Sequence, residues 1–223
     1  MKRVGNVFAG VVSPPVCFGC RRFASFESRF PLCAACESRW ALHTGPAISI
    51  GRLPVYFAMP YRGIGRKLIQ RFKIEEADYL APLLRHAIGR AVTGAQPDLG
   101  AYDALVPIPS HNSSFFKSWT SAARIAEILS ELTRLPVRAL LKRARPIRKQ
   151  SLLGKSERRA NVERAFEAVS GGRVSGGSFL LVDDVVTTGY TAEACAEALR
   201  ARGAAAVGLF AAARGELAGE VAA

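Results

Sequence analysis

The residues best suited to chemistry lie in one continuous stretch, Phe179–Thr191. An apolar run, Phe179–Val182, leads into two adjacent carboxylates, Asp183 and Asp184, and then into the small and hydroxyl-bearing residues of Thr187–Thr191. Carboxylates accept hydrogen bonds from sugar hydroxyls, whereas hydroxyl groups and the first N–H groups of a helix bind anions. The stretch therefore predicts a sugar-phosphate site at the carboxyl end of a buried parallel strand.

Each half of this stretch also has a simpler interpretation. Two acids can mark a solvated strand end, and a threonine–glycine run can be an ordinary turn. The stretch is not a Walker loop, because the Gly-Lys-Ser/Thr sequence is absent. It is the succession of buried strand, acids and small-residue loop that favours a ligand site.

The cysteines form a second pattern, C-x2-C-x12-C-x2-C, made of Cys17, Cys20, Cys33 and Cys36. Two close pairs of thiolates suit a tetrahedral zinc ion, and four cysteine ligands leave no open position for catalysis. We therefore expect structural zinc. Two disulfides, which need an oxidising compartment, and redox-active pairs are the alternatives. Cys195 stands alone in an alanine-rich stretch and is expected to be a packed residue.

The elements that must position these residues fall into three parts. Residues 1–45 form a four-cysteine zinc module with little core of its own. Residues 46–215 form the main domain, in which 46–100 is a strand and helical lead-in. In residues 101–215 strands and helices alternate, which predicts a parallel α/β sheet with flanking helices. Residues 216–223 are a tail.

Hydrophobic periodicity locates the individual elements. Strands are expected over residues 47–58 around a turn at 51–54, and over 104–108, 179–182 and 205–211. A weaker strand is expected over 136–141, and 161–169 is a strand or a helix end. Helices are expected around residues 62–73, 79–92, 118–134 and 191–202.

Charge is the remaining global feature, with 31 basic residues against 18 acidic ones and a formal charge of +13. Residues 134–164 hold eleven basic residues and two acids. Residues 142–159 are expected to be a loop, acting either as a lid over pyrophosphate or as a track for DNA. The residues proposed for this role are Arg143, Arg145, Arg148, Lys149, Gln150, Arg158 and Arg159. A smaller basic group, on the helix after Tyr61, is either solvated or a nucleic-acid contact.

The sequence gives no sign of a membrane segment. No apolar run reaches the roughly 18–20 residues that cross a bilayer. The apolar residues after Met1 are interrupted by Gly5 and Asn6, and no signal cleavage site follows them. We expect a cytoplasmic protein.

These motifs together resemble a known family. Residues 179–191 resemble the phosphoribosyl-pyrophosphate (PRPP) binding motif of type I phosphoribosyltransferases, and nearly the whole chain is similar to the ComF family of natural competence. The features that carry the similarity are the segment before Pro14-Pro15, the four cysteines, the Tyr61-Arg62-Gly63 helix, Val106-Pro107-Ile108-Pro109, residues 150–166 and the PRPP motif.

The resemblance implies a type I phosphoribosyltransferase fold, a zinc ribbon, and a role in bringing transforming single-stranded DNA into the cytoplasm. It implies that Asp183 and Asp184 bind the ribose hydroxyls and are the catalytic residues. Thr187, Thr188, Gly189 and Thr191 would hold the 5′-phosphate, and Tyr190 would belong to the same PRPP-binding site. PRPP would bind with Mg²⁺, and the turn comprising Pro109, Ser110, His111 and Lys117 would be the pyrophosphate loop.

The chain departs from the family in that turn. ComF proteins usually carry an arginine-rich loop and a Gly-Phe-Asn turn after the Pro-x-Pro strand. Here Lys117 is the only basic residue of 110–120, and Ser118 and Thr120 replace the glycine and the asparagine. The departure weakens the expectation of pyrophosphate binding more than that of ribose-phosphate binding.

Three functions are compatible with these residues. The first is a competence accessory protein that handles single-stranded DNA, with a PRPP-type site and a DNA-translocating partner. The second is an active phosphoribosyltransferase that releases pyrophosphate to an unknown acceptor. The third is a regulatory protein that senses PRPP without turning it over.

Overall fold

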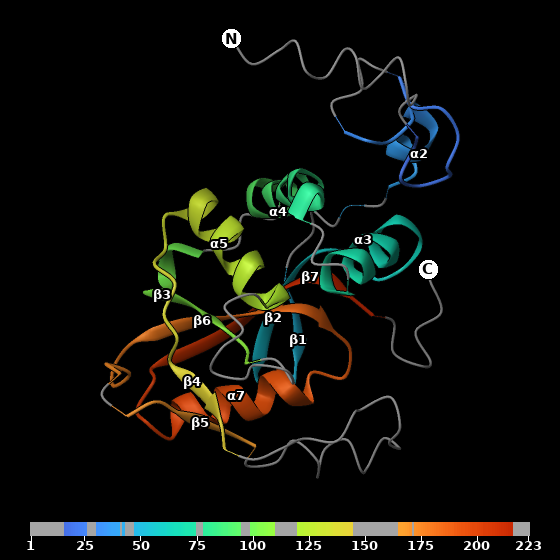
Figure 1. Cartoon of the computed structure of the whole chain (residues 1–223). Coiled ribbons are helices and arrows are strands. Elements are labelled where there is room, and N and C mark those ends of the chain that lie inside the picture. Colours follow the sequence, from blue (N-terminus) through green and yellow to red (C-terminus); the bar gives the residue numbers. More distant parts are fainter. Residues whose placement is uncertain are drawn as a thin grey trace.

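A mixed five-stranded sheet forms the centre of the molecule in the computed structural model (Figure 1). The structure describes residues 16–25, 30–40, 42, 47–74, 78–94, 99–109, 120–144, 165–170 and 172–215. The strands follow the order β1 (Ile48–Ile50), β2 (Leu53–Pro60), β7 (Ala206–Arg214), β6 (Ser178–Val186) and β3 (Ala104–Pro107). Only the β1–β2 pair is antiparallel. The predicted α/β class, with a mostly parallel sheet and flanking helices, is confirmed.

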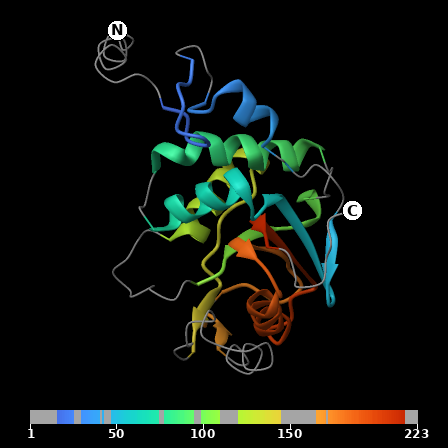
Figure 2. The ribbon, with the colours of Figure 1, turned by 90° about the vertical axis from the view of Figure 1, so that its right-hand side faces the viewer.

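Helices cover both faces of this sheet (Figures 1 and 2). Three of them lie on one face, α3 (Gly63–Ile74), α4 (Ala81–Gly94) and α5 (Ser121–Thr133), and α7 (Tyr190–Arg200) lies on the other. A two-stranded antiparallel sheet, β4 (Leu141–Arg143) with β5 (Phe166–Ala168), packs on the α7 side. None of the helices within the described ranges is long and apolar enough to cross a membrane.

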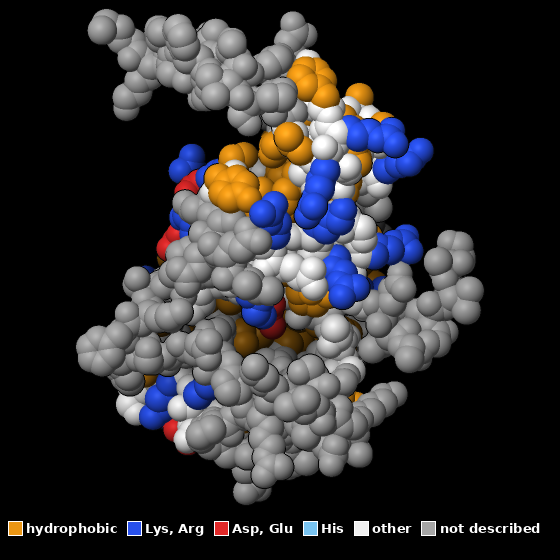
Figure 3. Space-filling model, turned by 45° about the vertical axis from the view of Figure 1, so that its right-hand side comes forward, with side chains coloured by type: hydrophobic (Ala, Val, Ile, Leu, Met, Phe, Trp, Pro, Cys, Tyr) orange, Lys and Arg blue, Asp and Glu red, His pale blue; other side chains and the backbone are white. Residues whose placement is uncertain are grey.

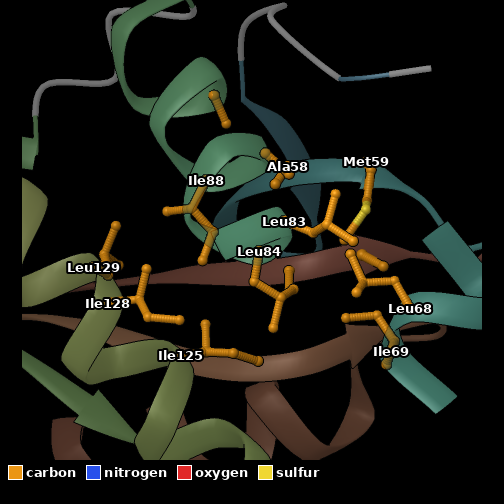
Figure 4. Close-up of a cluster of buried hydrophobic side chains, with 14 of the residues drawn as sticks. Ala58, Met59, Leu68, Ile69, Leu83, Leu84, Ile88, Ile125, Ile128 and Leu129 are labelled. Atoms are coloured by element: carbon orange, nitrogen blue, oxygen red, sulfur yellow. The ribbon is translucent and has the colours of Figure 1, made fainter. Parts of the chain in front are cut away.

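The core on the first face joins side chains from three helices and the sheet (Figure 4). Leu84 and Ile88 of α4 lie between α3 and α5, because residues four apart share one side of a helix. Ile125 of α5 is fully buried in the same cluster. The 3–4 spacing of apolar residues that predicted these helices is thus the spacing that fills this core.

The four-cysteine module packs on this same core. Figure 2 shows its helix α2 (Ala34–Ser38) beyond α4, on the side away from the sheet. Phe30 and Trp40 of the module belong to the same apolar cluster as the residues of α3 and α4. Their ring centroids lie 4.7 and 6.0 Å from that of His86 on α4. The module and the helical layer therefore share one continuous core.

Several sequence-based boundaries change in the structure. Residues 136–140 are not a strand, although Val137 forms an isolated bridge with Leu105, and Leu141 is the first residue of β4. Pro136 lacks an N–H group, so it can only accept, and its carbonyl takes the Leu105 N–H at 2.9 Å. The expected loop of 142–159 is wrong at its start, since Lys142 and Arg143 belong to β4, and residues 145–159 lie outside the described ranges.

Candidate functional site

The two acids, Asp183 and Asp184, lie within strand β6, close to its carboxyl end, rather than after the strand. β6 continues to Val186, because β7 pairs with it as far as that residue. On its other side β3 ends at Pro107, opposite Val182. The two acids therefore follow the point at which β6 loses one of its two neighbours, where parallel sheets bind ligands.

Adjacent residues of a strand point to opposite faces of a sheet, and the two acids follow this rule. Val182 packs with the α3–α5 core and Leu181 with the α7 core. Asp184 accordingly contacts side chains of α3 and α5. Asp183 lies on the α7 side: burial of the Cys195 thiol raises the pKa of that thiol, and the charge of Asp183 raises it further. The two acids thus lie on opposite faces of the sheet at the carboxyl end of β6.

Asp184 is buried, with 5% of its surface exposed, and two side chains hold it. Its Oδ2 atom lies 2.7 Å from the Lys73 ammonium of α3 and accepts a hydrogen bond of 2.5 Å from the Ser121 hydroxyl of α5. Burial alone would lower the pKa of Lys73, but the Asp184 carboxylate outweighs it and raises that pKa. Lys73 therefore serves as the fixed counter-charge of Asp184.

Among the described residues no cation forms an ion pair with Asp183, although the charge of Lys73 lowers the pKa of its carboxyl in part. Burial raises the pKa of its carboxyl, and the Asp184 carboxylate raises it further, to about 7. The backbone N–H of Asp184 donates to its Oδ1 at 2.8 Å and offsets part of this rise. Asp183 therefore changes charge near neutral pH, as a proton acceptor in catalysis must.

The loop that follows, Thr187–Gly189, ends where α7 begins. Gly189 adopts a φ of +77°, and a Cβ on it would lie 2.5 Å from the Ile50 side chain, so only glycine fits. This residue turns the chain into α7, whose Glu193 N–H donates to the Gly189 carbonyl at 2.8 Å. The start of α7 is thereby held next to the acids, and its first N–H groups have no helical acceptor.

The remaining predicted ligand residues are only partly described. Pro109 is half-buried and its carbonyl accepts from the Arg143 Nε atom at 3.3 Å. Arg143 also lies over the Phe166 ring, 5.5 Å from its centroid. The other predicted residues lie outside the described ranges: Ser110, His111 and Lys117 of the pyrophosphate loop, and Arg145, Arg148, Lys149, Gln150, Arg158 and Arg159 of the basic segment.

Two residues of this site were missed in the sequence. Lys73 was grouped with the other cations of its helix, and Ser121 was not singled out. No local signal separates Lys73 from those cations, since its role depends on a partner more than a hundred residues away. Ser121 follows the N-cap Thr120, whose side chain accepts from the Ala123 N–H at 3.1 Å, so a serine there looks like part of a helix start.

The four predicted metal ligands converge. The sulfur atoms of Cys17, Cys20, Cys33 and Cys36 all lie within 4.8 Å of one another, and none forms a disulfide. The Cys33 N–H lies 3.2 Å from the Cys17 sulfur. Burial raises the pKa of Cys17, but backbone hydrogen bonds outweigh it and lower that pKa to about 6. This donor set fits Zn²⁺, which binds thiolates in a tetrahedron.

The module is also attached to α3 by a polar contact. The Lys67 ammonium donates to the Gly19 carbonyl at 2.6 Å, within the first cysteine pair. A Cβ on Gly19 would lie 2.8 Å from the Cys36 sulfur and 3.5 Å from Ile64, so the chain approaches both closely. The first cysteine pair therefore sits directly on α3.

Lysine and arginine side chains gather on the surface formed by α3 and the module (Figure 3). We call this surface the basic face and define it by its exposed cations, Arg21, Arg22, Arg62, Arg66, Lys67 and Arg71. Phe23, 59% exposed, lies beside Arg22 in the chain. Arg71 lies 5.8 Å from the centroid of the Phe18 ring, which ties the two parts of the face together.

Comparison with known proteins gives one extensive match. No family model matches the chain. The chain is 30% identical over 203 residues to Competence protein F of Haemophilus influenzae, and the alignment covers 84% of this chain and 85% of that protein.

Solved structures give weaker matches. Glutamine PRPP amidotransferase from B. subtilis is 20% identical, with a TM-score of 0.36, over 57% of this chain and 25% of that chain. A purine phosphoribosyltransferase from Pyrococcus horikoshii is 13% identical, with a TM-score of 0.33, over 64% and 90% of the two chains. Adenine phosphoribosyltransferase from Leishmania donovani is 11% identical, with a TM-score of 0.40, over 76% and 86%. The chain thus spans a quarter of the amidotransferase chain.

Proposed function

Since the chain belongs to the ComF family, that of Competence protein F, we propose that it binds a ribose phosphate at the carboxyl end of β6 and handles single-stranded DNA in competence. The observation that supports the first part is the placement of Asp183 and Asp184 beside the start of α7. The acids would accept from the two ribose hydroxyls. The residues Thr187–Thr191 would bind the 5′-phosphate through N–H and hydroxyl groups.

The ligand proposed for this site is PRPP with Mg²⁺. The ion would neutralise the pyrophosphate of the ligand, and the acid pair offers it oxygen ligands of the kind it prefers. Isothermal titration of PRPP and of ribose 5-phosphate, with and without Mg²⁺, tests the site. Asp183→Asn with Asp184→Asn should remove binding of both ligands. Binding that survives in this double variant would refute the assignment.

A second function, an active phosphoribosyltransferase, is supported by the pKa of Asp183 near neutrality. In such a reaction a nucleophile attacks the anomeric carbon, the bond to pyrophosphate breaks, and the nucleophile loses a proton. Asp183 could accept that proton. Pyrophosphate release with a panel of nucleobases, lost in Asp183→Asn, is the test. Binding of PRPP without any turnover would favour a sensing role instead.

The DNA part of the proposal is supported by the basic face and by the exposed Phe23 within it. Cations that follow a backbone, together with an aromatic ring that stacks on bases, bind single strands without sequence preference. Affinity for an oligo-dT strand should fall steeply between low and physiological salt, because counterions are released on binding. A DNA-translocating competence protein is the partner we propose for this step.

Charge reversal of the basic face tests its role. Arg66→Glu should weaken single-strand binding about tenfold at low salt and reduce the salt dependence. Arg202→Glu, in the turn that follows α7, is the matched control because it changes total charge equally. Equal losses in the two variants would indicate an effect of net charge alone. An absence of strand binding at low salt in the unmodified protein would refute the DNA proposal.

A further inference from the structure

Two helices that are distant in sequence meet on one oxygen atom of the acid pair. Lys73, in the last turn of α3, lies 2.7 Å from Asp184 Oδ2, and Ser121, in the first turn of α5, donates to the same atom at 2.5 Å. Within the described part of the chain, no side chain forms a hydrogen bond or an ion pair with the second oxygen, Oδ1. Both contacts of Asp184 are therefore made by Oδ2, which leaves Oδ1 as an acceptor for a ligand.

We propose that Lys73 is a positioning residue, which keeps Asp184 ionised and oriented so that Oδ1 accepts a hydroxyl of the bound ribose. This inference rests on the proposed ribose-phosphate site and deepens it. It assigns Lys73 a role distinct from that of the other cations of α3, which lie on the basic face.

The charge balance of the site explains why a lysine is needed. Asp184 is 5% exposed and its neighbour Asp183 is also shielded, so two buried carboxylates would repel each other without a cation. The side chain of Lys73 is 57% exposed, so its own charge remains partly hydrated. Lys73 therefore balances the charge of Asp184 while its own side chain stays partly hydrated.

Ser121 supplies orientation rather than charge. It is 6% exposed, and its hydroxyl donates to the oxygen that Lys73 also contacts. Two contacts from different directions on one oxygen restrict the rotation of the carboxylate. An ionised acceptor with a fixed direction loses little entropy when a hydroxyl binds to it.

The test is a set of titrations of ribose 5-phosphate and PRPP into the full chain. At pH 7 Lys73→Met should weaken both ligands about 10- to 100-fold, the range expected when a hydrogen bond to a charged acceptor is lost. Lys73→Arg should restore most of the affinity. In an Asp184→Asn background, Lys73→Met should have no further effect, because its action passes through Asp184.

The pH dependence gives a readout that a merely structural role would not move. In Lys73→Met the acid pair loses the ammonium charge that lies beside it, so the loss of affinity should be larger near pH 6.5 than near pH 9. The other titratable groups that face this site in the described residues are Asp183 on β6 and Tyr61 before α3. The charge of Lys73 also lowers the pKa of Asp183, so the pH dependence reports on the acid pair rather than on one acid alone. Ser121→Ala keeps the charge and should give a smaller loss that is the same at both pH values.

The outcomes separate this inference from the proposed function. If the unmodified chain binds neither ligand, the ribose-phosphate site itself is refuted. If it binds both and Lys73→Met binds equally well, the positioning role is overturned. Additive losses in the double variant would also overturn it, because Lys73 would then contact the ligand directly. Arg90→Met, an exposed cation of α4 that belongs to no site, should bind as the unmodified chain does. If Lys73→Met does not fold, Ser121→Ala and Lys73→Arg still decide the question.

Discussion

The four-cysteine module and the carboxyl edge of β6 both concentrate ionisable groups, but they do so with opposite consequences. In the module, burial raises the pKa of Cys36 to about 12, together with hydrogen bonds to the neighbouring thiols and repulsion from the charge of Cys17. One metal ion between the sulfurs would relieve that repulsion. At the sheet edge, Lys73 neutralises the charge of Asp184, whereas the ionised form of Asp183 remains unfavourable. The four-cysteine module would thus be stabilised when its thiolates bind a metal ion. The carboxyl edge of β6, by contrast, is less stable because it keeps the Asp183 carboxylate free to bind a ligand.

The largest expected effect is that of metal removal on stability. A chelator should lower the melting temperature by roughly 10 °C or more, because structural zinc contributes several kcal/mol or more to folding. The exposed core of α3 and α4 should then bind a hydrophobic dye. Differential scanning calorimetry measures the change.

The control for this experiment is Cys195→Ala. Cys195 is the one cysteine outside the module and is buried in the α7 core. A chelator should lower the melting temperature of this variant by the same amount. If chelation leaves the unmodified chain equally stable, the module is not held by metal and the contrast with the sheet edge disappears.

The second expected effect is a gain in stability, on removal of the Asp183 carboxylate. The folded pKa of Asp183 is raised to about 7 from a usual value of 3.8, so the protonated acid favours folding and this contribution is lost as pH rises towards 7. Asp183→Asn should therefore increase the free energy of unfolding at pH 8 by up to about 4 kcal/mol. The gain should be close to zero at pH 4.

Urea unfolding of both proteins at pH 4, 6 and 8 measures this dependence. The variant should lose ligand binding while it gains stability, which is the signature of a residue kept for function. A variant that is less stable than the unmodified protein at pH 8 would contradict the assigned cost of Asp183.

The smallest effect concerns the backbone beside the acids. Gly189→Ala should destabilise the protein by about 1–2 kcal/mol through its left-handed φ, and more through contact with Ile50. Gly176→Ala is the matched control, because Gly176 has a φ of +75° and open space around its Cβ position. Only Gly189→Ala should also weaken phosphate-ester binding. Equal effects of the two substitutions on stability and binding would remove Gly189 from the site.

How far the sequence predicts this structure depends on the range of the interactions. The strand Phe179–Val182, the acids and the glycine turn are local, so their pattern alone predicted them together. The length of β6 was underestimated, because β7 extends the ladder to Val186 and sequence carries no record of that pairing. The convergence of Lys73, Ser121 and Asp184 arises from tertiary packing, which no periodicity of a single segment encodes.

The cysteine pattern is also local, and the four sulfur atoms lie close enough together to bind one metal ion, as their spacing in the sequence predicts. The sequence did not indicate which surface of the main domain the module packs against. Phe30 and Trp40 contribute to a core that also contains residues of α3, α4 and α5, which are separated from them by tens of residues. Apolar residues in a short metal-binding segment have no helical or strand period that would identify the surface they cover.

The position of Trp40 gives the molecule an optical reporter. The chain has two tryptophans, and Trp40 is 8% exposed, with its ring centroid 6.0 Å from that of His86. Its indole N–H has no hydrogen-bond partner among the described residues, so its emission reflects an apolar setting. In a Trp119→Phe chain, a red shift of fluorescence would mark the moment at which the module leaves α4. The rate of that shift under chelation, with and without PRPP, would then time the separation of the two regions in a single cuvette.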